Sequence, residues 1–178
     1  MIKKINCWEG KQYKLVSSDN YDAYLKELGM GLVQRKMGNS QQPIVLLHKI
    51  ESTHNLITLA NVEQEPTILT FKLDKAFDEE TYDLRKVSNV LHMFDNTLVQ
   101  EQKGIVTARI TREFHHTKMI ETLVANKVVA VRVFRALEED EMEDMSKVIG
   151  KLEADERQRQ ADGEENSRSK RKLEKKEH

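Results

Sequence analysis

The 178-residue chain has few cysteines and no long apolar run, the features that disulfide-bonded and membrane-spanning proteins require. Its single cysteine, Cys7, excludes an intramolecular disulfide and a CxxC metal site, and it suits a reducing compartment. No apolar run approaches the roughly 20 residues that a membrane-spanning helix needs. The first residues are basic but lack the apolar core of a signal peptide. We therefore expect a soluble intracellular protein.

Sequence signatures of catalysis are also missing. The chain contains no nucleophile elbow, P-loop or dinucleotide-binding fingerprint. His115 and His116 are adjacent but fall in an expected turn without an evident third ligand, so we expect no metal site. The acidic run at 78–80 is interpreted as a solvated turn. The sequence predicts a protein that is not an enzyme and needs no cofactor.

Charge is unevenly distributed, although the net charge is only -1. Residues 137–178 contain 14 acidic and 10 basic side chains, whereas residues 1–136 contain 16 acidic and 19 basic ones. The first part has the composition of an ordinary small domain, and the tail is too charged to bury a core. Neither balance argues for binding to a nucleic acid.

Short strands at regular spacing dominate the first 136 residues. Two short amphipathic helices at about 20–38 are expected after the first strand, at 10–17, with Ser18, Asp19 or Asn20 as the N-cap. Tight turns and the lack of βαβ units predict an all-β antiparallel barrel or sandwich of about ten strands, with the helix pair as a lid. The remaining strands are expected at 43–50, 53–61, 67–73, 81–86, 87–94, 97–103, 106–114, 118–125 and 128–136.

Two of these strands carry an arginine among apolar residues. In the last strand Arg132 shares a face with Ala130 and Phe134, and Arg112 has similar neighbours in an earlier strand. We interpret both as inward-facing arginines of neighbouring strands, each in need of an anion, water or an internal carboxylate, because an unpaired buried charge is costly. The alternative is a different register that exposes one of them.

Several segments also match a known family, in order and with compatible spacing. From Trp8 to about Ala136 the chain resembles the cytosolic fatty acid-binding proteins of the intracellular lipid-binding family, above all the insect members. The resemblance rests on Asp83 and on the segments GKQYKL (10–15), NYDAYLKELG (20–29), RKMGN (35–39), TFKL (70–73), FDEET (77–81), RKV (85–87) and QEQKG (100–104).

This resemblance implies a ten-stranded, calycin-like β-clam that is closed by a two-helix lid and holds one long-chain fatty acid. The family binds the carboxylate through an Arg-x-Tyr on the last strand and a second arginine two strands earlier. The corresponding residues here are Arg132, Phe134 and Arg112, and Phe134 lacks the phenolic hydroxyl of the family's tyrosine. The resemblance also implies that Asp83 and Arg85 are interior polar residues near the ligand.

Glu121 is a second departure from the family. It alternates with Met119 and Leu123 on a face that family members usually keep apolar and inward. Glu121 would then be an internal carboxylate that pairs with one arginine and competes with the ligand's head group. We expect weaker or differently placed head-group binding; the alternative is that Glu121 lies near water at the end of its strand.

The resemblance ends near residue 136, which divides the chain into a lipid-binding domain, 1–136, and an extension, 137–178. A narrow apolar stripe predicts a helix at about 138–160 or a short coiled-coil seam, followed by disorder. The basic run at 167–172 is solvated, a nuclear localisation signal or a contact for an acidic surface, so a cytoplasmic location is expected, with the nucleus as an alternative. The stripe consists of Met142, Met145, Ile149 and Leu152.

The function expected from the resemblance is that of a monomeric carrier of a long-chain fatty acid, with a transient membrane contact through the lid. Two alternatives stay open. The ligand could be a retinoid or another hydrophobic molecule, because pocket shape is not readable from sequence. Or the chain could be an interaction or regulatory protein with weak lipid affinity that acts through its tail.

Overall fold

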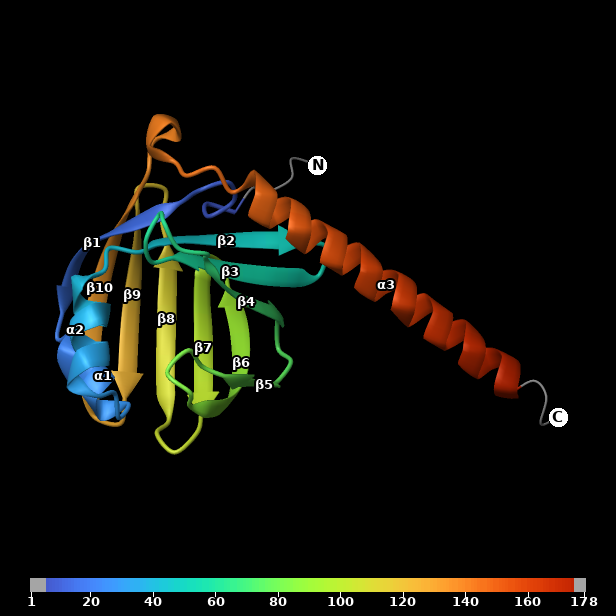
Figure 1. Cartoon of the computed structure of the whole chain (residues 1–178), viewed down its shortest axis with the longest axis horizontal. Helices are drawn as coiled ribbons and strands as arrows, with labels where there is room; N and C mark the ends of the chain where they lie inside the picture. The colour runs from blue at the N-terminus through green and yellow to red at the C-terminus, as the bar shows by residue number, and fades with distance from the viewer. Residues whose placement is uncertain (1–5, 175–178) are drawn as a thin grey trace. The chain divides into compact units, whose positions relative to one another are not determined.

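The computed structural model describes residues 6–174, and the chain divides into two compact units, Met1–Met142 and Glu143–His178. The first unit contains a ten-stranded sheet, the helices α1 (Tyr21–Glu27) and α2 (Leu32–Ser40), and a 3-10 turn, η1 (Glu139–Glu141) (Figure 1). The second unit contains α3 (Ser146–Glu174). The strands are β1 (Tyr13–Asp19), β2 (Ile44–Ile50), β3 (Thr53–Leu59), β4 (Thr67–Lys72), β5 (Phe77–Glu80), β6 (Lys86–Phe94), β7 (Thr97–Lys103), β8 (Ala108–Phe114), β9 (Lys118–Ala125) and β10 (Val128–Ala136).

The ten strands form one antiparallel sheet in the order β4-β3-β2-β1-β10-β9-β8-β7-β6-β5. Every neighbouring pair except β1 and β10 is consecutive in the sequence, and the pairing of β1 with β10 bends the sheet into a nearly closed barrel. A register shift between Leu15 and Ser17 marks a bulge in β1, which pairs with β10 along its length and with β2 at its start. The predicted ten-stranded all-β barrel with a two-helix lid is therefore confirmed.

Tight turns connect many of the strands at the positions that the sequence indicated. Glu51, Asp95 and Asn126 begin the β2–β3, β6–β7 and β9–β10 turns with φ values of 53°, 52° and 52°. Positive φ is the conformation that short hairpin turns need, and aspartate and asparagine tolerate it better than most residues. These turns fix the register of each hairpin.

The lid begins differently from the sequence prediction. Asn20 precedes α1 but has a left-handed backbone (φ 59°) and makes no side-chain capping bond. Its Nδ2 instead donates to the carbonyl oxygen of Val129 at 2.9 Å, which ties the start of the lid to β10. Strand β1 continues to Asp19, so Ser18 and Asp19 belong to the sheet and do not cap the helix.

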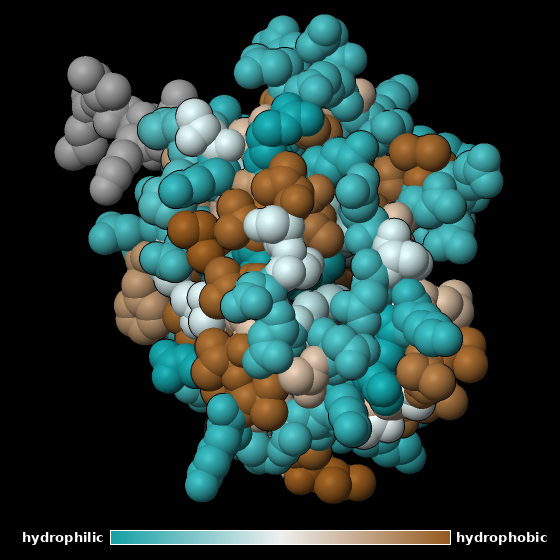
Figure 2. All heavy atoms as spheres, turned by 90° about the vertical axis from the view of Figure 1, so that its left-hand side faces the viewer, coloured by the Kyte–Doolittle hydropathy of each residue, from teal (hydrophilic) through white to brown (hydrophobic). Residues whose placement is uncertain are grey.

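The two lid helices differ in burial. Helix α1 buries Tyr24 and Leu25 against the barrel, whereas α2 buries no residue. Figure 2 shows the face on which the lid lies, where apolar patches alternate with polar side chains. Leu32, Val33 and Met37 of α2 are all exposed.

The strand expected at 81–86 is wrong, and so is the interpretation of 78–80 as a turn. Strand β5 ends at Glu80 and pairs with β6, and residues 81–85 form the turn between them. Leu84 has φ 64° in that turn, which is incompatible with a strand. Charged residues in β5 suggested a loop, but they suit an edge strand, where charge discourages pairing with other chains.

The C-terminal helix begins later and extends further than the predicted 138–160. Helix α3 has 29 residues and continues through Glu174, so most of the segment that was expected to be disordered after 160 is helical. Residues 175–178 of that prediction lie outside the described residues. Arg159 donates to Glu156 at 2.7 Å and Gln158 to Asp162 at 2.8 Å, and such pairs three and four residues apart stabilise a helix with little apolar surface. High charge density was therefore a misleading sign of disorder. Within residues 6–174, no helix combines the length and the apolar character needed to cross a membrane.

Candidate functional site

The barrel interior contains two clusters of buried apolar residues. The lid-side cluster, where α1 packs against β8, β9 and β10, consists of Tyr24, Leu25, Leu28, Met30, Ala108, Ile110, Leu123, Ala125 and Ala130. The base cluster consists of Cys7, Trp8, Tyr13, Leu15, Val45, Leu47, Leu56, Phe71, Leu91, Leu98, Phe114, Met119 and Phe134. The strand residues of both clusters, such as Ala108 and Ile110 of β8, stand at alternate positions, as expected for an inward face.

Three charged residues lie on the same inward face. Glu121 of β9 is directly opposite Arg112 of β8 on one side and Arg132 of β10 on the other. Arg112 Nε donates to Glu121 Oε2 at 3.0 Å, and Arg132 Nη1 donates to Glu121 Oε1 at 3.4 Å. Arg112, Glu121 and Arg132 are only 8%, 4% and 7% exposed. We call these residues the charged triad.

The triad corrects two details of the sequence interpretation. The arginines are not on neighbouring strands, because β9 lies between β8 and β10. Glu121 pairs with both arginines and not with one, since each carboxylate oxygen accepts from a different guanidinium. The alternatives, an exposed arginine or a Glu121 near water, do not agree with the burial of all three residues.

Two positive charges and one negative charge leave the triad with a net charge of +1. Arg132 has two further neighbours: its Nε donates to Ser18 Oγ at 3.4 Å, and its Cζ lies 4.0 Å from the ring centroid of Tyr21 in α1. This cation–π contact connects the lid to the triad. Burial raises the pKa of the Tyr21 phenol, although the positive charge of Arg132 acts in the opposite direction.

A row of hydrogen bonds continues from the triad across three more strands. Arg112 Nη1 donates to Gln100 Oε1 at 3.0 Å, and Gln100 Nε2 donates to Asn89 Oδ1 at 3.0 Å. Asn89 Nδ2 then donates to Glu79 Oε2 at 2.6 Å. We call Gln100, Asn89 and Glu79 the polar row. Sequence reasoning missed it, although the alternation of Gln100 with the apolar Leu98 would have placed Gln100 inward.

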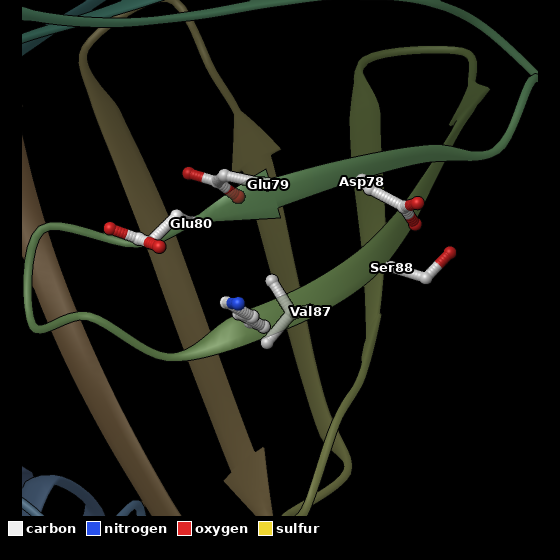
Figure 3. A pocket seen from close by; sticks show the side chains of 6 residues that line it. Asp78, Glu79, Glu80, Val87 and Ser88 are labelled. Atoms are coloured by element: carbon white, nitrogen blue, oxygen red, sulfur yellow. The ribbon is translucent and has the colours of Figure 1, made fainter.

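The polar row ends beside a pocket at the edge of the sheet. Figure 3 shows Glu79 and its acidic neighbours on β5 above Val87 and Ser88 of β6. The pocket has a volume of about 460 Å³ and is lined by Asp78, Glu79, Glu80, Lys86, Val87 and Ser88. Four of its six lining residues are charged.

Comparison with known proteins agrees with this barrel fold. The model of the lipocalin / cytosolic fatty-acid binding protein family matches residues 9–147, more than three quarters of the chain. The chain belongs to this family. The muscle fatty acid-binding protein of Schistocerca gregaria is 37% identical over 137 residues, which cover 76% of this chain and 99% of that protein.

Solved structures of family members have the same fold. The fatty acid-binding protein from brain tissue of Drosophila melanogaster is 44% identical, with a TM-score of 0.68, over 72% of this chain and 98% of that one. The Schistosoma mansoni fatty acid-binding protein, solved in complex with arachidonic acid, is 29% identical, with a TM-score of 0.69, over 74% of this chain and 97% of that one. The expected family and its insect-like character are thus confirmed.

The family's aromatic position on the last strand is occupied by Phe134. Its ring is fully buried in the base cluster, and its centroid lies 5.5 Å from Arg132 Cζ. The ring supports the guanidinium through a cation–π contact but has no hydroxyl to donate to a carboxylate. Whether Phe134 contacts a ligand stays a prediction.

Asp83 and Arg85 lie in the β5–β6 turn and pair with each other. Arg85 Nε donates to Asp83 Oδ2 at 2.7 Å, and Thr81 Oγ1 donates to Asp83 Oδ1 at 2.6 Å. Arg85 Nη1 is buried and has no hydrogen-bond partner among the described residues. The turn therefore holds the two side chains that the family resemblance selected, but their bonds do not join them to the charged triad. A role near the ligand stays a prediction.

The Asp83 carboxylate should make stability depend on acid pH. Burial alone would raise its pKa, but hydrogen bonds from Arg85 and Thr81 outweigh burial and hold the pKa below the ordinary value of 3.8. Because the folded-state pKa is depressed, the stabilisation is fully present above about pH 4 and is lost as the pH falls through the folded-state pKa. Urea unfolding should show that the free energy of unfolding falls less steeply with decreasing pH in Asp83→Asn than in wild type. If the free energy of unfolding depends on pH in the same way in both proteins, the prediction is wrong.

Proposed function

We propose that this family member is a cytosolic carrier that binds one long-chain fatty acid reversibly inside the barrel. The acyl chain would lie against the apolar clusters, and its carboxylate would bind between Arg112 and Arg132. The observation that supports this most strongly is the net charge of +1 on a buried triad, because one monoanionic head group would neutralise it. No bond is made or broken, so the proposal includes no catalysis.

Most of the affinity should come from the acyl chain. Burying about 15 methylenes at roughly 0.8 kcal/mol each is favourable by some 12 kcal/mol before ordering costs. The head-group ion pair contributes less because the carboxylate loses its hydration. It would mainly orient the ligand, with its carboxylate beneath the lid residue Tyr21.

Glu121 should moderate the head-group contact. Its two oxygens already accept from the arginines that would bind the ligand, so the incoming carboxylate must share their donors and approach a like charge. Phe134 supplies no hydroxyl to compensate. We therefore propose a carboxylate site that is functional but weaker than two arginines alone would make it.

Oleate titration of the delipidated full-length chain tests the function. Native mass spectrometry should show uptake of one oleate per chain. Arg112→Gln should lower the affinity about tenfold, since a charge-assisted contact is lost, whereas Arg109→Gln, on the exposed face of the same strand, should not change it. A well-folded wild-type chain that takes up no oleate would contradict the proposal.

A second candidate function is regulation through the C-terminal extension. It is favoured by the 29-residue helix α3, almost all of which lies beyond the residues that the family model matches. The two functions make different predictions for a chain that ends at Met142, the boundary of the first unit. A carrier should keep its oleate affinity without the extension. Loss of oleate binding in the shortened, folded chain would favour the second function.

A further inference from the structure

One side chain on the inward face of β7 does not take part in the polar row. Gln102 lies two residues after Gln100, on the same face, and is only 6% exposed. Its Oε1 is fully buried and accepts no hydrogen bond from the part of the chain that the structure describes. A buried carbonyl oxygen without a donor is costly, so Gln102 Oε1 is a buried acceptor that no donor among the described residues satisfies.

Among the described residues, the cross-strand neighbours of Gln102 supply no donor to its Oε1. Its cross-strand partners are Asn89 on β6 and Ala108 on β8. The Asn89 side chain forms hydrogen bonds with Glu79 and Gln100, since its Nδ2 donates to Glu79 and its Oδ1 accepts from Gln100. Ala108 has only a methyl group and offers no donor.

The position of Gln102 relative to the charged triad defines what could reach it. Gln102 pairs with Ala108, and Arg112 lies four residues further along β8, so the two Cα positions are roughly 14 Å apart. A molecule whose carboxylate lies at Arg112 would therefore meet Gln102 with a distal part of its chain. On a long acyl chain, that part carries a hydrogen-bond donor only if it is oxygenated.

From this geometry we propose that the chain's ligand is a hydroxylated long-chain fatty acid, whose distal hydroxyl donates to Gln102 Oε1. This inference rests on the proposed function and specifies the ligand of the same site. The hydroxyl would donate to Gln102 Oε1, and this bond would replace the hydrogen bond to water that the hydroxyl loses on burial. Without an acceptor in the interior, the burial of the hydroxyl would be costly. Two polar anchors at opposite ends of the acyl chain would then determine its orientation.

The test compares three ligands on the delipidated full-length chain by displacement of a fluorescent fatty acid. Stearate is the parent, 12-hydroxystearate carries the distal hydroxyl, and 2-hydroxystearate carries it beside the carboxylate. Gln102→Leu removes the acceptor at similar volume and also removes an unsatisfied polar atom, so the variant should fold. Ile110→Leu, an inward change in the lid-side cluster without polar atoms, is the matched control.

Wild type should bind 12-hydroxystearate at least as tightly as stearate. Gln102→Leu should weaken 12-hydroxystearate binding about fivefold, the value of one hydrogen bond, and leave stearate and 2-hydroxystearate unchanged. Ile110→Leu should not alter the ratio between the ligands. If Gln102→Leu changes the affinity for all three ligands equally, the distal hydroxyl does not bind Gln102 and the inference is wrong, while the proposed function stands. If wild type binds none of them, both are wrong.

Discussion

Replacing Glu121 with Gln is expected to raise the affinity for oleate about tenfold or more. A carboxylate roughly 5 Å from a bound head group, at an effective dielectric constant of about 20, opposes binding by roughly 3 kcal/mol, of which solvation recovers a part. Glutamine keeps the size of the side chain and one acceptor but removes the negative charge. Isothermal titration of both delipidated proteins with oleate measures the difference.

Oleyl alcohol and a second variant control this result. The alcohol has the same chain without a charge, so its affinity should change little in Glu121→Gln. Glu113→Gln removes a carboxylate from the outer face of β8 and should leave both affinities unchanged. An oleate affinity that stays the same in Glu121→Gln would show that Glu121 does not compete with the head group.

Replacing Glu121 with Met is expected to lower the free energy of unfolding of the ligand-free chain by about 3–5 kcal/mol. The substitution leaves Arg112 and Arg132 buried without their shared carboxylate, and an uncompensated buried charge is strongly destabilising. Urea unfolding of the delipidated proteins measures this loss. Oleate should restore more stability to the variant than to wild type, because it supplies the missing anion.

The triple substitution Arg112→Met, Glu121→Met and Arg132→Met separates charge from packing. Buried ion pairs can often be replaced by apolar residues at no net cost, so the triple variant should recover most of the stability that Glu121→Met loses. It should also bind oleate and oleyl alcohol equally well. A triple variant less stable than Glu121→Met would mean that the methionines fail to pack, and the loss could not then be assigned to charge.

Much of the barrel could be predicted because strand patterns are local. Alternation placed Arg112 and Arg132 on inward faces, and turns such as Asp95-Asn96 and Asn126-Lys127 separated the hairpins correctly. Strand β5 could not be recognised, because its charged residues have low strand propensity and pair only through contact with β6. Helix α3 was underestimated for a related reason, since its charged side chains pair with one another along the helix.

The contacts of the candidate site were harder to predict than the strands, because they form between segments that are distant in the sequence. Glu121 was expected to meet one arginine, and it meets both because two turns set the register of β9 against β8 and β10 at the same residue. The contacts of Arg132 with Ser18 and Tyr21 required the closure of β1 onto β10 and the packing of α1, which join parts of the chain more than 100 residues apart. No local pattern contains such contacts.

The sequence by itself determined the all-β class, the family and the inward direction of the charged residues, since each follows from alternation or from matching segments. Only the tertiary structure decided which charges are paired, that the triad keeps a net charge of +1, and that Gln102 Oε1 accepts no hydrogen bond from the residues that the structure describes. The physical reason is that alternation selects a face, whereas strand register and barrel closure select the neighbour.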